Sequence, residues 1–266
     1  MRGIAPLPLI THNPSLILVL GVIGGSGLSV LANLEVVRRQ IVRTPYGEPS
    51  SALTFGRIGG RDIVFLARHG HGHTIPPHLV NYRANIWALH AQQVREVISI
   101  ASVGGIRDDL TPGELVVPNQ ILDYTYGRET TFSGDAEHGV VHIDFTHPYC
   151  EGLRRRILKA AVAAGHRATD GATYAATQGP RLETAAEIDR LARDGADMVG
   201  MTGMPEAALS RELDLCYAAL AVVVNHAAGR GASADGVRMD DINVVSQTAM
   251  SKVRHILERL VEIDGD

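Results

Sequence analysis

The chain has 266 residues, of which 45% are hydrophobic and 20% charged, and its formal net charge is −4 at neutral pH. These values are ordinary for a globular protein with a sizeable core, and the negative charge argues against a protein that binds nucleic acid or another polyanion. The only two cysteines are Cys150 and Cys216. We predict that both are small buried apolar residues outside any disulfide framework, which fits a reducing compartment, the cytoplasm.

The N-terminal stretch resembles a signal peptide in its single arginine and apolar runs, but three prolines interrupt the first run. The second run, residues 16–23, leads into a glycine turn rather than a cleavage site, so a buried strand is favoured. No apolar run reaches the length that spans a membrane. We predict a disordered extension over residues 1–15 and one domain over residues 16–266.

A glycine-rich turn, Gly24-Gly25-Ser26-Gly27, follows this first strand. The backbone N–H groups of such a turn can surround an anion. It is not a dinucleotide fingerprint, because the pattern would need glycine at the position of Val30. A plain tight turn is the alternative interpretation.

A hairpin is predicted next, with Gly59-Gly60 as its turn, and its second strand leads to Arg68-His69-Gly70-His71-Gly72-His73. Three histidines in one loop suggest a metal site, but no cysteine or carboxylate lies nearby to complete the ligands, so we predict no metal. Arg68 and His69 are better explained as an anion clamp, since the planar fork of an arginine suits an anion.

The remaining elements are predicted in chain order from hydrophobic periodicity and capping residues. Thr184 is expected to cap a helix from Ala185 to Asp194, with Glu187 completing a capping box. The other predicted elements are a helix over 80–93, a strand over 97–101 that ends in a second glycine turn from Ser102, short strands over 115–118 and 120–124, a helix over 148–164 with a solvated basic face at 154–156, a strand over 171–177 and a final amphipathic helix over 240–261.

The stretch Val199 to Gly229 predicts a strand, a helix that opens at Pro205, and a second strand that ends at Asn225. We interpret it as a βαβ unit, and open α/β sheets place their sites at the carboxyl ends of strands. Polar residues follow several predicted strands in this way: Ser26, Arg68, His69, Ser102, residues 178–183, Met201, Thr202 and Asn225. Hydroxyls and an arginine favour a small anion, and a carboxylate with an amide suggests a heterocycle, so together they favour a phosphate and a nucleobase.

At these positions the chain resembles a known family. G-G-S-G-L, R-H-G-H-x-H, V-N-Y-R-A-N-I-W-A-L, G-P-R-L-E-T-x-A-E and M-T-G-M-P-E-A are similar to motifs of the trimeric purine nucleoside phosphorylases and methylthioadenosine phosphorylases. The resemblance runs from Val22 to the C-terminal helix. It implies a single-domain α/β fold, with a mixed sheet flanked by helices, in a homotrimer. It also implies phosphorolysis of a purine nucleoside, with phosphate as co-substrate and no cofactor.

By this resemblance the phosphate is held by Ser26, Arg68, His69, Ser102 and Thr202, and Met201 lies under the ribose. Desolvated phosphate would stabilise the oxocarbenium character of the sugar, and donors aimed at the base would stabilise the departing purine. For Ser26 the alternative is a plain turn residue, and for Thr202 a helix cap.

The base is predicted from two positions. Family members acting on adenine nucleosides have aspartates where this chain has Asn225 and Ala227, whereas members acting on 6-oxopurines have asparagine at the first and a glutamate where this chain has Glu183. Glu183 can accept from N1–H while the Asn225 amide donates to O6 or N7. A 6-oxopurine is therefore predicted, with Leu182 beside it; the alternative for Glu183 is a charge at a helix N-terminus.

The 5′ end of the substrate is predicted from the C-terminal region, which has no histidine between Ala227 and Arg254 to meet a 5′-hydroxyl. An apolar lining suited to a methylthio group is offered by Val237, Met239 and Ile242, with His142 contributed by a neighbouring subunit. The combination resembles the branch of the family that acts on methylthioinosine. The alternatives are cleavage of inosine or guanosine, cleavage of methylthioadenosine, and a nucleoside-binding protein without catalysis.

Overall fold

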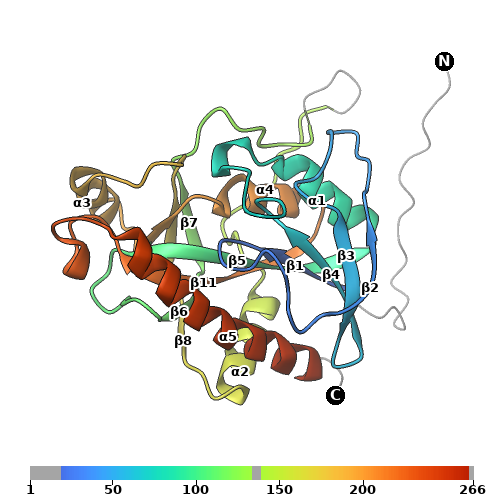
Figure 1. The fold of residues 1–266 in the computed structure, drawn as a ribbon. Coiled ribbons are helices and arrows are strands. Elements are labelled where there is room, and N and C mark those ends of the chain that lie inside the picture. Colours follow the sequence, from blue (N-terminus) through green and yellow to red (C-terminus); the bar gives the residue numbers. More distant parts are fainter. Residues whose placement is uncertain (1–18, 134–138, 264–266) are drawn as a thin grey trace.

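The computed structural model describes residues 19–133 and 139–263, so the predicted extension over residues 1–15 lies outside the described residues. One mixed sheet forms the centre of the molecule, and helices cover both of its faces, which confirms the predicted fold class (Figure 1). Its strands are β1 (Val19–Gly24), β2 (Glu35–Gln40), β3 (Leu53–Ile58), β4 (Arg61–Ala67), β5 (Val94–Gly105), β6 (Leu115–Val117), β7 (Gln120–Asp123), β8 (Ala168–Asp170), β9 (Thr173–Ala176), β10 (Met198–Gly200) and β11 (Cys216–His226). The α-helices are α1 (Tyr82–Ala91), α2 (Glu151–Ala163), α3 (Ala185–Arg193), α4 (Gly203–Glu212) and α5 (Met239–Ile263).

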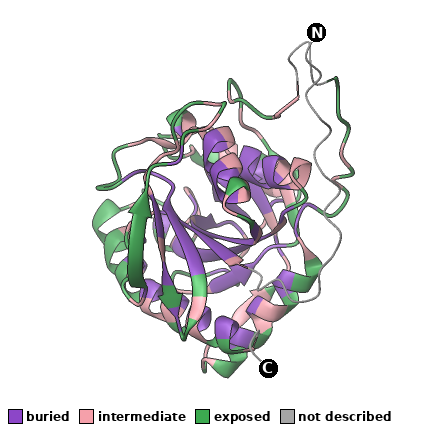
Figure 2. Ribbon diagram, turned by 90° about the vertical axis from the view of Figure 1, so that its right-hand side faces the viewer, coloured by how far each residue is buried: buried purple, intermediate pink, exposed green. Residues whose placement is uncertain are grey.

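Two apolar layers make up most of the core, one on each face of the sheet. Helices α1 and α4 contribute residues such as Ile86 and Leu209 to one layer. Helices α2 and α5 contribute Ile157 and Leu257 to the other. The central strands are buried, whereas the edge strand β2 is exposed along its whole length (Figure 2). Within the described residues, no helix combines the length and apolarity needed to cross a membrane.

The two edges of strand β5 pair with different strands. One edge pairs in parallel with β11 from Glu96 to Gly105. The other edge pairs with β1 only as far as Ser99, and with β10 only at Gly104 and Gly105. Among the described strands, none pairs with residues 100–103 of β5 at this edge. The sheet therefore has a local gap between the end of β1 and the end of β10.

Strand β5 is also longer than predicted. The sequence predicts a turn from Ser102, but the strand continues through Gly104 and Gly105. Glycine is required at 105 by a close approach, since a Cβ there would lie 2.0 Å from the carbonyl oxygen of Leu110. The glycine pair thus forms the last two residues of the strand, and Gly105 packs closely against the segment that follows it.

The segment from β10 to β11 is not the predicted parallel βαβ unit. Strand β10 runs antiparallel to β5 while β11 runs parallel to it, so β10 and β11 point in opposite directions. Because β10 runs back along β5, the residues that follow it, Met201 and Thr202, return to the gap in the sheet. Helical geometry begins at Pro205 as predicted, since Met204 still has an extended backbone with φ −120° and ψ 141°.

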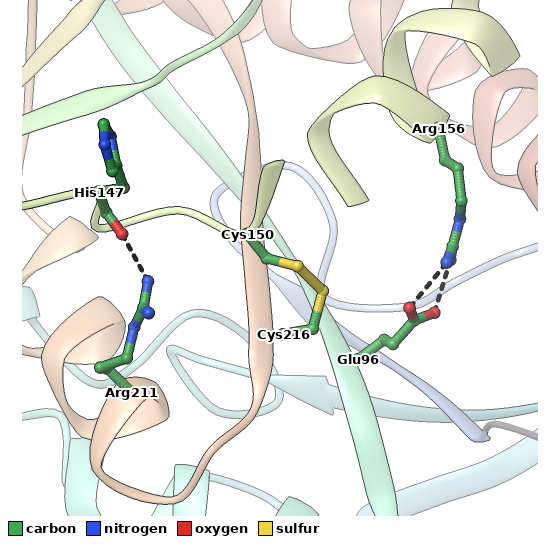
Figure 3. Close-up of a disulfide and its surroundings, with 6 residues drawn as sticks. All are labelled: Glu96, His147, Cys150, Arg156, Arg211 and Cys216. Carbon is green, nitrogen blue, oxygen red and sulfur yellow. Dashed lines mark hydrogen bonds and ion pairs between the residues drawn. A yellow bond between two sulfur atoms is a disulfide. The ribbon is translucent and has the colours of Figure 1, made fainter. Parts of the chain in front are cut away.

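The predicted start of α3 is confirmed by its capping residues. Thr184 accepts from the backbone N–H of Glu187 and the Glu187 carboxylate accepts from that of Thr184, which confirms the capping box of α3. The basic face of α2 is not simply solvated, however. Arg154 is buried and donates to the carbonyl of Pro118 at 2.7 Å, and Arg156 pairs with Glu96 (Figure 3). Charge alone does not show which arginine points inward.

The prediction of two free thiols is wrong, because Cys150 and Cys216 form a disulfide (Figure 3). Cys150 precedes α2 and Cys216 begins β11, and the backbone N–H of Cys150 donates to the carbonyl of Tyr217 at 2.8 Å. This contact brings together two segments that are 66 residues apart in the chain. Disulfides are rare in cytosolic proteins, so the cysteines no longer argue for a reducing compartment.

Removing the disulfide is expected to lower the free energy of unfolding by about 2–4 kcal/mol, because the bond closes a loop between residues 66 positions apart and so restricts the unfolded chain. Urea unfolding of the wild type and of the Cys150→Ser/Cys216→Ser variant measures the difference. Activity should be retained, since neither cysteine lines the cavity described below. Equal unfolding midpoints for the oxidised and reduced wild type would contradict this prediction.

Candidate active site

A cavity of about 400 Å³ lies at the gap beside β5. It is formed where β1, β4 and β11 end, where the chain leaves β10, and where α5 begins. Every predicted site residue except His142 lines it: Ser26, Arg68, His69, Ser102, Leu182, Glu183, Met201, Thr202, Asn225, Ala227, Met239 and Ile242. The antiparallel course of β10 is what brings Met201 and Thr202 to the same place as the ends of the parallel strands.

Three hydroxyl groups come from different elements at one end of the cavity. Ser26 lies in the turn after β1, Ser102 in the unpaired part of β5, and Thr202 two residues after β10. Ser102 Oγ donates to the backbone oxygen of Ser26 at 3.4 Å. Thr202 occupies the N-cap position of α4, but its side chain makes no capping hydrogen bond, so the helix-cap interpretation is wrong. Its side chain lines the cavity and interacts with the Tyr174 hydroxyl.

Arg68 is fully buried, and its fork of donors faces Glu206 instead of the cavity. Nε and Nη2 donate to the Glu206 carboxylate at 2.7 and 2.9 Å. Nη2 also donates to Ser99 Oγ at 2.6 Å, and Nη1 to the carbonyl of Ile100 at 3.0 Å. A guanidinium has five N–H donors, so one hydrogen on Nη1 remains. Nη1 lies beside Gly25, where an added Cβ would be 2.9 Å from it.

Glu206 is the partner that the sequence analysis missed. It is fully buried on α4 and also accepts from Ser99 Oγ at 2.6 Å and Tyr217 Oη at 2.9 Å. Burial alone would lower the pKa of Arg68, but the charge and hydrogen bond of Glu206 outweigh it and raise that pKa above its ordinary value. Arg68, which lines the cavity, is therefore one member of a buried ion pair whose other member, Glu206, does not line it. The M-P-E-A motif contains Glu206 but gives no sign of its partner.

His69 is held as a neutral imidazole. Burial, together with the neighbouring charge of Arg68, lowers the pKa of His69 to about 4. Its Nδ1 lies 2.8 Å from the carbonyl oxygen of Ile75. A carbonyl can only accept, so Nδ1 carries the proton and Nε2 is left with a lone pair. His69 can therefore accept a hydrogen bond from a ligand hydroxyl. The His73 ring lies 4.5 Å from that of His69 and also lines the cavity.

The second end of the cavity presents a carboxylate and an amide. Glu183 Oε1 accepts from Thr177 Oγ1 at 2.6 Å, and Asn225 Nδ2 donates to the carbonyl of His226 at 2.6 Å. The second N–H of the Asn225 amide and Oε2 of Glu183 have no hydrogen-bond partner among the described residues. Ala227 is buried in the wall beside them. Thr177 was not among the predicted site residues, because its role depends on a side-chain contact that the sequence does not reveal.

The third part of the cavity is apolar. Val237, Met239 and Ile242 line it at the start of α5. Met239 is 58% exposed and Ile242 is half-buried, so this part of the wall lies near solvent. Met201 lies between the ends, and its Sδ approaches Gly179 so closely that a Cβ there would lie 2.4 Å away. His142 is exposed and does not line the cavity of its own chain.

Comparisons with known proteins agree on the family of this chain. The Phosphorylase superfamily matches residues 19–262. A "Probable S-methyl-5'-thioinosine phosphorylase" of Pseudomonas syringae pv. tomato is 49% identical over 91% of this chain and 98% of its own length. A "Probable 6-oxopurine nucleoside phosphorylase" of Thermococcus kodakarensis is 47% identical over 79% of this chain and 80% of its own. The solved structure of methylthioadenosine phosphorylase from Schistosoma mansoni with adenine is 33% identical, with a TM-score of 0.88 over 93% of this chain and 92% of that one.

The chain belongs to the phosphorylase superfamily. Both the family match and the two named relatives extend over most of the chain, and the structural match covers the same sheet and helices. The protein is thus an enzyme of the nucleoside phosphorylase class, a pentosyltransferase. This agrees with the family resemblance inferred from its motifs.

The buried imidazole of this phosphorylase should make its stability depend on pH. The pKa of His69 is about 4 in the folded protein and about 6.5 when unfolded. The unfolded chain therefore binds the proton more readily between these values, and stability falls as the pH is lowered through that window. From pH 7 to pH 5 the loss from His69 is about 2 kcal/mol. Urea unfolding at both pH values measures how much unfolding free energy is lost between them. This loss should be smaller by the same amount in His69→Asn than in the wild type, and equal losses in the two proteins would refute the assignment.

Proposed function

We propose that the protein cleaves S-methyl-5'-thioinosine with phosphate, giving hypoxanthine and 5-methylthio-ribose 1-phosphate, in purine salvage. The observation that carries this proposal is the base end of the cavity, where Glu183 and Asn225 lie beside a buried alanine, Ala227. Relatives named for methylthioinosine and for 6-oxopurine nucleosides support it.

The base end matches the edge of a 6-oxopurine. Hypoxanthine presents an N1–H donor and an O6 acceptor. The unpartnered Oε2 of Glu183 can accept from N1–H, and the remaining N–H of Asn225 can donate to O6 or N7. Adenine presents the opposite groups and would leave buried polar atoms unpaired, at about 1–3 kcal/mol each. An aspartate at position 227 could accept from the 6-amino group, but Ala227 cannot.

The anion end suits phosphate. The hydroxyls of Ser26, Ser102 and Thr202 and the remaining N–H of Arg68 are donors, while His69 Nε2 accepts from a protonated oxygen of phosphate or from a ribose hydroxyl. A phosphate oxygen then forms a bond to C1′ as the bond from C1′ to the purine nitrogen breaks and its electron pair leaves with the base, which takes up a proton. These groups would act by positioning and by stabilising the charge that develops.

The 5′ end, the assembly and the location complete the proposal. Val237, Met239 and Ile242 offer a methylthio group an apolar wall. In the proposed homotrimer, His142 of a neighbouring copy would reach this end, and the exposure of Val140 and Val141 next to it supports an interface there.

Phosphate serves as co-substrate, so the proposed reaction needs no cofactor. The cytoplasm remains the proposed location because of the proposed role in purine salvage, and no longer because of the cysteines.

Rates of phosphate-dependent purine release from methylthioinosine, inosine and methylthioadenosine, at equal concentrations, test the proposed substrate. We expect the order methylthioinosine, then inosine, then methylthioadenosine. Fastest release from methylthioadenosine would refute the base assignment. Thr202→Ala should raise the KM for phosphate, whereas Thr248→Ala, an exposed position on α5, should not.

A purine nucleoside phosphorylase acting on inosine or guanosine is the second candidate. The exposure of Met239 favours it, because a 5′-hydroxyl at this end could be hydrated. Met239→Ala separates the two: it should weaken cleavage of methylthioinosine and leave that of inosine nearly unchanged if the methylthio group packs there.

A further inference from the structure

Glu183 lies in the wall between two cavities. One is the nucleoside cavity, and the other is a neighbouring cavity of about 270 Å³ that is lined by Arg181 and Arg190. Thr177 lines only this outer cavity. A flexible carboxylate at such a position can face the nucleoside or turn into the outer cavity, where Arg181 already pairs with Glu187 and Arg190 with Asp194. A further contact is needed to hold it at the nucleoside.

Thr177 is a rigid anchor for that contact. Its backbone N–H donates to the carbonyl of Gly200 at 2.8 Å, and its own carbonyl accepts from Arg128 Nη2 at 3.2 Å. Arg128 also donates to the carbonyl oxygens of Gln178 and Met201, both at 2.9 Å. The end of β9 and the residues after β10 are therefore tied together, and the Thr177 side chain starts from a fixed point.

The hydroxyl of Thr177 has one proton and two neighbouring acceptors. Glu183 Oε1 lies at 2.6 Å and the carbonyl oxygen of Gly200 at 3.2 Å. The Gly200 carbonyl already accepts from the Thr177 backbone, so the hydroxyl of Thr177 is assigned as the donor to the Glu183 carboxylate. The shorter distance is typical of a hydroxyl that donates to an ionised carboxylate. This bond occupies Oε1 and leaves Oε2 without a partner among the described residues.

We propose that Thr177 is a positioning residue that determines the preference for 6-oxopurines, by holding the Glu183 carboxylate at the nucleoside with Oε2 free to accept from N1–H. The inference rests on the proposed function, because it requires a base with a donor at N1. Without the hydroxyl, the carboxylate is no longer held and can turn away from the nucleoside, and the N1–H of the base loses its acceptor.

Thr177→Val and Thr177→Ala remove the hydroxyl, the former with little change of shape, and Thr177→Ser keeps it. We expect kcat/KM for methylthioinosine to fall about 10- to 100-fold in the valine and alanine variants and to stay within about threefold of wild type in the serine variant. Cleavage of methylthioadenosine, which has no N1–H, should change much less, so the ratio of the two substrates falls. The KM for phosphate should not change, because the anion end is intact.

Two results would overturn the inference. One is an unchanged substrate ratio in both the valine and the alanine variants. The other is an equal loss on both substrates that the serine variant shares, which would indicate a purely structural role. If the wild type cleaves inosine rather than methylthioinosine, the proposed 5′ specificity fails, and the ratio of inosine to adenosine decides the role of Thr177 separately. A wild type that prefers the adenine nucleosides would refute both.

Discussion

Glu206→Gln is expected to lower the free energy of unfolding by about 3–5 kcal/mol, the typical cost of removing one partner of a buried ion pair. Glu206 and Arg68 are both fully buried, and the glutamate accepts hydrogen bonds from Arg68, Ser99 and Tyr217. A neutral amide would leave the guanidinium charge uncompensated and would direct its own N–H donors at groups that are themselves donors. Chemical unfolding followed by circular dichroism measures the change.

The ion pair between Arg57 and Asp62 provides the control, since both of its side chains are more than half exposed. Asp62→Asn should cost less than about 1 kcal/mol. The double variant Arg68→Met/Glu206→Leu should recover much of the stability that Glu206→Gln loses, because no charge is then left unpaired in the core. It should nevertheless bind phosphate weakly, since the remaining Nη1 donor is gone. A loss below about 1 kcal/mol in Glu206→Gln would show that the pair is not isolated from water.

Asn225→Asp combined with Ala227→Asp is expected to raise the ratio of kcat/KM for methylthioadenosine over methylthioinosine by about 100-fold, because each aspartate exchanges a mismatched group for a matched one. Both positions line the cavity, so the new carboxylates can accept from the 6-amino group of adenine. Steady-state kinetics with the two nucleosides at saturating phosphate give the ratio.

Asn225→Asp combined with Ala227→Leu is the matched control, because leucine has the branched shape of aspartate and the same number of side-chain heavy atoms but no acceptor. It should shift the ratio much less than the double aspartate variant. If both double variants show the same ratio of the two substrates, base specificity depends more on filling the space beside the base than on hydrogen bonds to it. An unchanged ratio in the double aspartate variant would place base specificity elsewhere.

Local signals in the sequence predicted the elements that they directly encode. Thr184 and Glu187 define the start of α3 through side-chain caps, and Gly59-Gly60 marks the turn between β3 and β4. Strand β2 carries no such signal, since its residues are all exposed and half of them are charged. The family motifs led to one set of site residues, and all but His142 line one cavity. What the sequence by itself determined is therefore the helices and strands with strong local signals, the family, and the residue types around the ligand.

Only the tertiary structure decided how those residues are used. Strand β10 is antiparallel to β5, a pairing that no local pattern predicts. The guanidinium of Arg68 donates two hydrogen bonds to Glu206, which lies 138 residues further along the chain. Cys150 and Cys216 meet through a contact between α2 and β11. Each of these outcomes joins segments that are remote in sequence, and partners at such a distance are selected by packing and burial, which act only once the chain is folded.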